Sequence, residues 1–573
     1  MSLLSSRALL DLALQLLDPN QSTKAVLSAP GRKPAIAVGA SRQPLPTDRP
    51  ETQGVSSRQI AGFLQALSKD PTLNMHSVLI LRHGRILCRA AFGAQPLDLP
   101  RQTYSACKSI TALAVGLAMD DGLLHRDDLI TELFDDVCPA LSRRLLRKLT
   151  VEHLLTMTAS ITFNEASSQA AEDWVRGYLS SPGISEQGKK FSYNSLNTYL
   201  LAAAVVKVTG RSLCDYLQER LFTPMGIHDY HWDTCPRGIE KGGWGLYMLP
   251  EDLAKLGLLV QQNGNWNGRQ LISRDFLETA LQPWALVPEE YGDFNYGWQI
   301  WVGRTKNTFL FNGMFGQNVL CDRDNDLILV SHAGNNETFQ QSNYFSIVRQ
   351  FFDQPLSSEP LPRDRKGQRM LSDCLKSLSD CRGKVPSRRN FAPFDGLRLT
   401  AISPGCASAG LLPLVLQAVE NNYSQGLEGL SIGGSRKFPQ LIYKEKDQTF
   451  HITAGTKKPL LQKLDIHGSK YLISAQAQCL VNEDGCPVLR FTLLLPETPC
   501  TRTVKIILTP KGTVVRQQEQ PGSDFLLQLL PDLSRNAAAR AVVGTLLGSS
   551  DRAYVRWRIQ SVFDQLLRFD KIP

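Results

Sequence analysis

The apolar positions of this chain follow a helical period in some segments and a strand period in others. Residues 56–67 repeat apolar side chains at helical spacing, whereas residues 76–92 contain two strand-like runs that meet at His83-Gly84. Helical patterns then dominate from Ser105 to about Leu221, and strand patterns return between Tyr296 and His332. Strands on both sides of a helical middle predict one sheet assembled from both ends of a domain. We place this domain at residues 51–352.

Two further parts of the chain have different patterns. Residues 1–50 combine an amphipathic helix with a Pro-, Gly- and Ser-rich linker, and residues 353–390 are again typical of a linker. Residues 391–573 contain short alternating runs with a turn about every ten residues, which predicts a mainly β, small barrel-like domain. Helical spacing returns at residues 534–569. We find no catalytic motif in this second domain.

Composition narrows the class of protein. A chain of 573 residues with 42% hydrophobic and 20% charged residues is typical of folded, multidomain proteins. The net charge of +9 comes from short basic patches without interleaved aromatic residues, so we expect no nucleic-acid partner. No apolar run approaches the ~20 residues of a membrane span, so we expect no membrane partner. The twelve cysteines lack a repeated spacing and the first residues lack a cleavage site, which predicts a cytoplasmic protein.

The start of an alanine-rich helix presents a serine and a lysine. Residues 110–119 are small and apolar on all sides, which indicates a buried helix, and Ser105 and Lys108 precede it three residues apart on one helical face. A serine nucleophile needs a base and a place for an oxyanion. The free N–H groups of a helix start supply that place, and a half-buried lysine has a lowered pKa. The alternative is a capping serine followed by a surface lysine.

A tyrosine in the polar segment 189–195 (K-K-F-S-Y-N-S) is the third candidate. Tyr193 stands directly before another helix of small residues. A tyrosine titrates near pH ~10, but a neighbouring ammonium makes its phenolate accessible, and Tyr193 can then act as a general base. The alternative is a core tyrosine with a satisfied hydroxyl.

Taken together, these motifs resemble the β-lactamase-like serine hydrolases, which include class C β-lactamases, D-peptidases, esterases and 6-aminohexanoate-dimer hydrolases. The resemblance covers residues 55–350 and depends on Ser105-Ala-Cys-Lys108 and Tyr193-Asn-Ser195, supported by phrases at residues 154–160, 208–227 and 242–257. It implies an α/β (α+β) β-lactamase/transpeptidase-like fold with an antiparallel sheet and a helical subdomain. It also implies a serine acyl-enzyme mechanism that needs no cofactor.

The family's third motif has two candidates in this chain. Relatives carry Lys-Thr-Gly, His-x-Gly or Trp-x-Gly on the strand that borders the active site, and this chain offers Phe311-Asn312-Gly313 and His332-Ala333-Gly334. We favour the first, because only it is followed by a glycine-containing stretch, a strand, an acidic turn and another apolar strand. By resemblance, the oxyanion then lies between the N–H groups of Ser105 and Met314. The resemblance implies a substrate-binding role for Ser195, Phe311, Asn312 and Gly313.

The phenylalanine at position 311 changes the expected substrate. A lysine there would bind a substrate carboxylate, which phenylalanine cannot do. We therefore expect an esterase or amidase acting on small-molecule ester or amide substrates. The alternatives are a D-amino-acid peptidase or β-lactamase, and a non-catalytic ligand-binding or scaffold protein on the same fold. Four aromatic residues could line an apolar acyl pocket or could simply pack: Trp174, Trp244, Phe311 and Phe315.

One further segment contains residue types that bind metals. His228, His231 and Asp233 lie within six residues, but no other cluster supplies the remaining ligands, so we expect a solvated loop and no metal. No pattern in the sequence predicts an oligomeric state.

Overall fold

The predicted hairpin at residues 76–92 forms as expected. Strands β1 (Met75–Arg82) and β2 (Arg85–Ala91) pair in antiparallel fashion around His83-Gly84, where φ is 49° and 69°. A left-handed backbone at both positions is the geometry of the tightest hairpin turn. The computed structural model describes residues 32–169, 171–183, 185–380, 391–402, 409–524 and 552–571. The helix predicted near the N-terminus, within residues 1–17, lies outside the described residues.

The chain divides into two compact units, of which the first contains residues 36–379. Its central sheet is antiparallel throughout, with strand order β2-β1-β12-β11-β10-β9-β8. The first two strands come from the N-terminal side of the unit and the other five from its C-terminal side, as the pattern predicts. The later strands are β8 (Phe294–Tyr296), β9 (Trp301–Gly303), β10 (Thr308–Gly313), β11 (Gln317–Asp322) and β12 (Leu327–Ala333).

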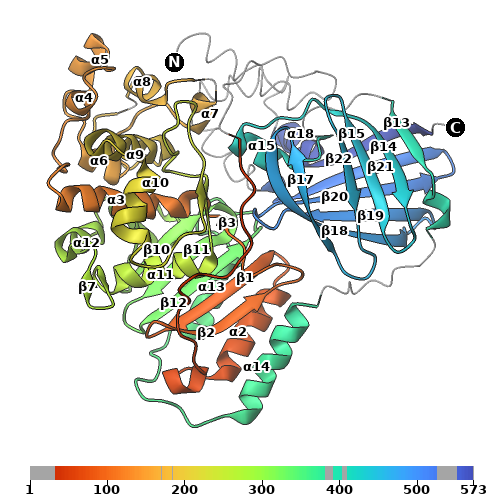
Figure 1. Ribbon diagram of the computed structural model, residues 1–573, viewed down its shortest axis with the longest axis horizontal. Coiled ribbons are helices and arrows are strands. Elements are labelled where there is room, and N and C mark those ends of the chain that lie inside the picture. The colour runs from red at the N-terminus through yellow and green to blue at the C-terminus, as the bar shows by residue number, and fades with distance from the viewer. Residues whose placement is uncertain are drawn as a thin grey trace. The chain divides into compact units, whose positions relative to one another are not determined.

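Helices cover both faces of this sheet (Figure 1). Alternate residues of β1 point to opposite faces, so Val78 and Ile80 join one apolar cluster while Leu79 and Leu81 join another. The first cluster includes side chains of α2 (Ser57–Lys69) and α13 (Asn343–Phe352), and the second includes α3 (Cys107–Asp120) and α11 (Pro250–Gln261). The β-lactamase/transpeptidase-like fold with an antiparallel sheet is thus confirmed.

The helical middle of the first unit packs around α3 and α9 (Ser195–Thr209), which contact each other closely. Its other helices are α4 (Ile130–Leu133), α5 (Ala140–Leu145), α6 (Val151–Leu155), α7 (Glu165–Ser168), α8 (Trp174–Leu179), α10 (Leu213–Leu217) and α12 (Arg274–Ala280). Short strands accompany them: β3 (Arg101–Gln102), β4 (His231–Trp232), β5 (Leu246–Met248), β6 (Asn265–Trp266) and β7 (Arg269–Gln270). No helix among the described residues combines the length and the apolar character that crossing a membrane requires.

The segment predicted as a linker at residues 353–390 contains a helix. Helix α14 (Arg365–Leu378) lies against α2, and Asp364 both caps its first turn and forms an ion pair with Arg58, with Nε and Oδ2 2.6 Å apart. Leu371 and Cys374 are buried on its inner side. The polar composition of this segment belongs to the outer face of an amphipathic helix, which explains why it resembles a linker.

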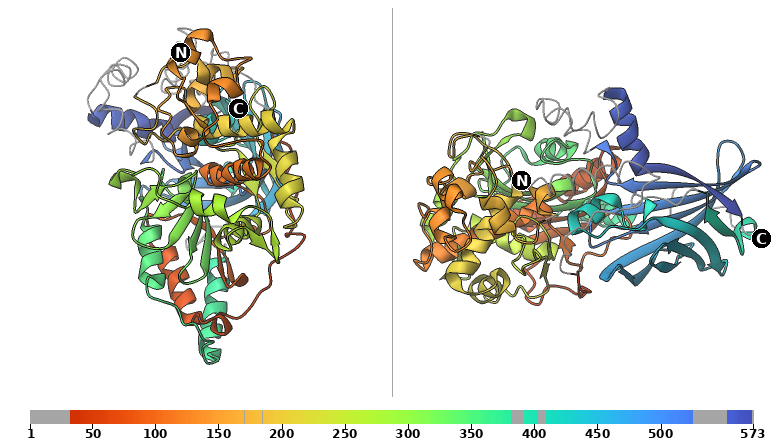
Figure 2. Two further views of the ribbon diagram at one scale, coloured as in Figure 1. Left: turned by 90° about the vertical axis from the view of Figure 1, so that its left-hand side faces the viewer. Right: turned by 90° about the horizontal axis from the view of Figure 1, so that it is seen from above.

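The second unit contains a ten-stranded antiparallel sheet that nearly closes into a barrel, which confirms the predicted mainly β domain (Figure 2). Gly455 donates to the carbonyl of Ala475 and accepts from the N–H of Ala477, which joins the segment after edge strand β16 to β18, the strand next to the opposite edge. Its strand order is β16 (Thr449–Thr453), β15 (Pro439–Glu445), β14 (Leu427–Gly434), β13 (Arg398–Ala401), β22 (Asp564–Lys571), β21 (Gly512–Gln520), β20 (Thr501–Thr509), β19 (Pro487–Leu494), β18 (Ser469–Val481) and β17 (Leu460–Ile466).

In the described part of the second unit, helices α15 (Leu414–Glu420) and α18 (Arg552–Phe563) accompany the barrel. The helical pattern predicted over residues 534–569 is correct within α18 and wrong at its end, because residues 564–571 form strand β22 between β13 and β21. Residues 534–551 of this prediction lie outside the described residues. Phe569 is buried in the barrel core, whereas Leu566 is exposed. This alternation has a period of two, and so short a run cannot be separated from a helix by spacing alone.

Candidate active site

The short helix η2 (Tyr104–Ala106) brings Ser105 to the start of α3, in agreement with the predicted helix start. Nearly all of α3 is buried, from Cys107 to Ala118, so its position is held by packing on every side. Ser105 remains partly exposed at its N-terminal end. The buried helix therefore presents one reactive side chain at the surface of the unit.

Lys108 lies within hydrogen-bond distance of Ser105. Its Nζ is 3.0 Å from Ser105 Oγ, 2.8 Å from Ser195 Oγ and 2.7 Å from the carbonyl oxygen of Gly243. The side chain is fully buried, and this desolvation lowers the pKa of Lys108 to about 8. A neutral amine in this position can donate to Gly243 and Ser195 and still accept the Ser105 proton through its lone pair.

Tyr193 completes the predicted trio, and its ring lies 5.1 Å from Lys108 Nζ. Its ring centroid lies within 6.4 Å of the centroids of four other rings, those of Phe191, Tyr296, Trp301 and Phe339. Tyr291 packs in turn against Phe191 and Phe339. Burial raises the pKa of Tyr193 far above its ordinary value, against a smaller lowering by its hydrogen bond with Ser105. The structure thus differs from the expectation that the lysine makes the phenolate accessible, because the rings desolvate the hydroxyl and Lys108 itself is driven toward its neutral form.

The end of β10 approaches η2 so closely that only glycine fits at position 313. A Cβ on Gly313 would lie 2.2 Å from the carbonyl oxygen of Thr103 and 3.2 Å from the amide nitrogen of Ala106. Ser105 is the second residue of η2 and Met314 the first of η5 (Met314–Gly316), where backbone N–H groups lack an acceptor within the helix. The structure therefore brings together the two segments that carry the predicted oxyanion donors.

The segment after Gly313 is held by its neighbours. The backbone of Phe315 exchanges two hydrogen bonds with Asn335 and Glu337, of 3.1 and 3.0 Å. The buried Gln317 amide donates to the carbonyl oxygens of Met314, Phe315 and Ala333. These bonds orient the peptide groups around Met314.

The side chains of the predicted third motif face the protein interior. Phe311 is fully buried in the core beside Phe309, and the Asn312 amide donates to Asn318 Oδ1 at 2.8 Å. The alternative histidine, His332, lies on β12 within 3.4 Å of Ser77 Oγ, and burial lowers its pKa. Of the other residues predicted to bind substrate or line an acyl pocket, Trp174, Ser195 and Phe315 are buried and Trp244 is partly exposed.

The sequence reasoning missed two residues, one that contacts Lys108 and one that contacts Ser195. Gly243 accepts a hydrogen bond from Lys108, and a Cβ there would lie 2.7 Å from the carbonyl oxygen of Ser195 and 3.3 Å from Lys108 Nζ. Glu165 on α7 accepts the N–H of Ser195 at 3.1 Å. Gly243 belongs to a phrase that supported the family resemblance, so its spacing was a usable signal. The sequence around Glu165 contains no comparable signal.

Among the described residues, two clusters contain metal-binding residue types. In the first unit, His231 and Lys241 contact the two oxygens of Asp233, at 3.0 and 3.5 Å, and form a small ion cluster. In the second unit, Glu445, Asp447 and His467 place one ligand atom each within 4.8 Å of one another.

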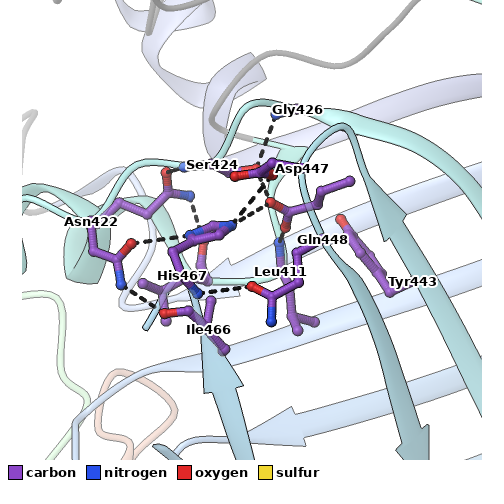
Figure 3. A network of polar contacts seen from close by, with 12 residues as sticks. Leu411, Asn422, Ser424, Gly426, Tyr443, Asp447, Gln448, Ile466 and His467 are labelled. Atoms are coloured by element: carbon purple, nitrogen blue, oxygen red, sulfur yellow. Dashed lines mark hydrogen bonds and ion pairs between the residues drawn. The ribbon is translucent and has the colours of Figure 1, made fainter. Parts of the chain in front are cut away.

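Protein groups already occupy this second cluster, as Figure 3 shows. Glu445 Oε1 accepts the N–H of Leu411, Oε2 accepts from Ser424 and His467, and the other ring nitrogen of His467 faces Asn422 Oδ1. Acceptors face both ring nitrogens, so the arrangement suits an imidazolium that donates twice.

The chain is similar to known proteins. The family model described as Beta-lactamase matches residues 60–342. Penicillin-binding protein 4* of Bacillus subtilis is 23% identical over 345 residues, which cover 51% of this chain and 75% of that protein. Monacolin J acid methylbutanoyltransferase of Aspergillus terreus is 26% identical over 203 residues, covering 31% of this chain and 49% of that protein. Among solved structures, EstCE1, a hydrolase with promiscuous acyltransferase activity, has a TM-score of 0.43 at 16% identity, covering 52% of this chain and 98% of that one.

Proposed function

Residues 60–342 belong to the beta-lactamase family, and from this premise we propose that the chain is a serine hydrolase that acts on small ester or amide substrates through an acyl-enzyme. The contact that supports the proposal most directly joins Lys108 Nζ to Ser105 Oγ at 3.0 Å. A buried lysine with a pKa near 8 is a base of the right strength to take a hydroxyl proton at neutral pH. The relatives named as a penicillin-binding protein and a methylbutanoyltransferase are consistent with acyl transfer to a nucleophile.

In the acylation step, Lys108 takes the Ser105 proton while Oγ attacks the substrate carbonyl. The tetrahedral oxyanion accepts hydrogen bonds from the N–H groups of Ser105 and Met314. Tyr193, kept protonated by its aromatic surroundings, hands its proton to the leaving alkoxide or amine and regains one from the Lys108 ammonium. This assigns to Lys108 the role of base and to Tyr193 the role of proton carrier.

Deacylation reverses these transfers with water as the nucleophile. Lys108, neutral again after the leaving group departs, accepts a proton from water through Tyr193 as the hydroxide adds to the acyl carbonyl. The same two N–H groups bind the second oxyanion, and Ser105 Oγ leaves with the proton returned by Tyr193.

The buried Phe311 bears on the substrate class. Relatives that bind a substrate carboxylate carry lysine at this position by resemblance, whereas here an apolar ring fills the core. The cation that a D-amino-acid peptidase or β-lactamase would be expected to use is therefore missing at position 311. Substrates without a carboxylate beside the reacting bond fit the site better.

The test is a burst assay with p-nitrophenyl butyrate, combined with intact-mass detection of the adduct. The wild type should release one equivalent of p-nitrophenol rapidly and gain one butyryl group, and Ser105→Ala should do neither. Equal activity in both proteins would contradict the proposal. No activity in either protein, across neutral, cationic and carboxylate-bearing esters, would favour the scaffold alternative.

A further inference from the structure

An exposed carboxylate lies at the candidate site and has no assigned role. Glu165 Oε1 accepts the N–H of Ser195, whose hydroxyl in turn accepts from Lys108, so a short series of hydrogen bonds connects Glu165 to Ser105. Among the described residues, Glu165 forms no ion pair and its second oxygen accepts no hydrogen bond. One oxygen is therefore anchored by backbone while the other remains available to a ligand.

The charges around Ser105 favour a positively charged substrate. Lys108 is buried and makes three hydrogen bonds within the protein, so its charge is largely hidden from a bound molecule. Phe311 provides no cation. Among the described groups that hydrogen-bond to Lys108 or Ser195, Glu165 is the exposed charged side chain, and its field attracts cations.

Aromatic rings near Tyr193 add to this preference. Phe191, Tyr193, Tyr291 and Phe339 are each partly exposed and contact one another. The faces of such rings attract ammonium groups, quaternary ones in particular. The Glu165 carboxylate interacts electrostatically with Tyr193, and a carboxylate together with partly exposed rings is suited to an amine that has lost part of its water shell.

We propose that Glu165 forms a subsite for a cationic group of the substrate, so that preferred substrates are esters or amides with an ammonium group a few bonds from the reacting carbonyl. This inference rests on the proposed function, because it concerns the substrate of the same Ser105. Glu165 is a specificity residue in this scheme and takes no part in the bond-making steps.

Matched pairs of cationic and neutral isosteric substrates test the subsite. One pair places the charge on the acyl side: p-nitrophenyl 4-(trimethylammonio)butyrate against p-nitrophenyl 5,5-dimethylhexanoate. The other places it on the leaving group: butyrylthiocholine against S-(3,3-dimethylbutyl) thiobutyrate. The variants are Glu165→Gln and Glu172→Gln, the latter removing an exposed carboxylate from the same surface segment.

We expect at least one pair to show a kcat/KM ratio of about fivefold or more in favour of the cation at low salt. Glu165→Gln should bring this ratio close to one, whatever its effect on the rate for the neutral ester, and Glu172→Gln should preserve the ratio. The subsite is excluded if the wild-type ratio is one or less in both pairs, or if the preference survives Glu165→Gln.

The neutral esters separate this result from a failure of the proposed function. Ser105-dependent hydrolysis of a neutral ester without any cation preference would overturn the subsite alone. Both proposals would be overturned if the wild type hydrolysed none of the substrates. They would also be overturned if Ser105→Ala hydrolysed every substrate as fast as the wild type does.

Discussion

Tyr104 and Phe315 meet edge to face, with ring centroids 5.2 Å apart and an angle of 90° between their planes. Both have left-handed backbones, with φ of 48° and 66°, which is strained for a large side chain. Tyr104 directly precedes Ser105 and Phe315 directly follows Met314. The ring contact therefore fixes the spacing of the two proposed oxyanion donors.

A double-mutant cycle on this pair should reveal the coupling. Tyr104→Leu, Phe315→Leu and the double variant are compared in acylation rate and in free energy of unfolding. We expect a coupling energy of about 0.5–1.5 kcal/mol, typical of an aromatic pair, and a fall of about tenfold in acylation rate for each single variant. Additive effects on the acylation rate would show that the contact does not position the donors.

The acylation rate should depend on the protonation of Lys108. Because burial lowers its pKa to about 8, the amine becomes neutral as the pH rises, and the rate should rise with a midpoint near that value. Stopped-flow bursts with p-nitrophenyl butyrate between pH 6 and 10 measure this. Lys108→Arg retains the charge but cannot lose its proton, so it should lose at least about 100-fold in rate at every pH. A rate that is flat across this range would contradict the role of Lys108 as base.

Gly313→Ala should damage catalysis more than stability. The new methyl group would lie 2.2 Å from the carbonyl oxygen of Thr103, so β10 and η2 must separate and the Met314 amide must move. We expect kcat to fall by about 100-fold or more, the usual effect of losing one oxyanion donor. Gly39→Ala is the matched control, because its Cβ meets no atom within 4 Å. Equal activity of the two variants would argue against Met314 as a donor.

Phe311→Lys should destabilise the first unit rather than create a carboxylate site. The side chain is fully buried in the core, where an unpaired ammonium is strongly unfavourable. We expect a loss of more than about 3 kcal/mol in the free energy of unfolding, and a smaller loss for Phe311→Leu. Urea unfolding followed by tryptophan fluorescence measures both. A stable Phe311→Lys protein that hydrolyses carboxylate-bearing esters would show that the strand can turn this side chain outward.

The His467 network should stabilise the barrel more at low pH than at high pH. Glu445, Asp447 and Asp465 raise the pKa of His467 above its ordinary value of 6.5, against desolvation, so the folded protein holds this proton more tightly than the unfolded chain. The stabilisation is thus fully present below pH 6.5 and is lost as the pH rises through the folded value.

Hydrogen exchange checks this for peptides covering residues 409–424 and 460–470, with rates corrected for intrinsic exchange at pH 5.5 and 8.0. Protection should be higher at pH 5.5 in the wild type. His467→Asn, which tolerates the left-handed backbone at this position, should remove the difference. His451→Asn, an exposed histidine on β16, should leave it unchanged. If the difference in protection between pH 5.5 and 8.0 persists in His467→Asn, another titrating group causes it.

The sequence by itself determined the local elements and the order of the motifs. The spacing of Ser105 and Lys108 follows from one helical turn, and the hairpin at His83-Gly84 follows from turn chemistry. Period alone could not assign β22 or α14, because a short strand resembles a helix and the polar face of an amphipathic helix resembles a linker.

Only the tertiary structure decided the chemistry of the site. Residues 105, 165, 193, 243 and 314 are far apart in the chain, and their distances depend on how α3, α9 and β10 pack. Packing also buries Lys108 and desolvates the hydroxyl of Tyr193, and this desolvation shifts their pKa values in opposite directions, since it disfavours the charged form of each. Residue types can be read along a chain, whereas desolvation is a property of the surroundings and exists only after folding.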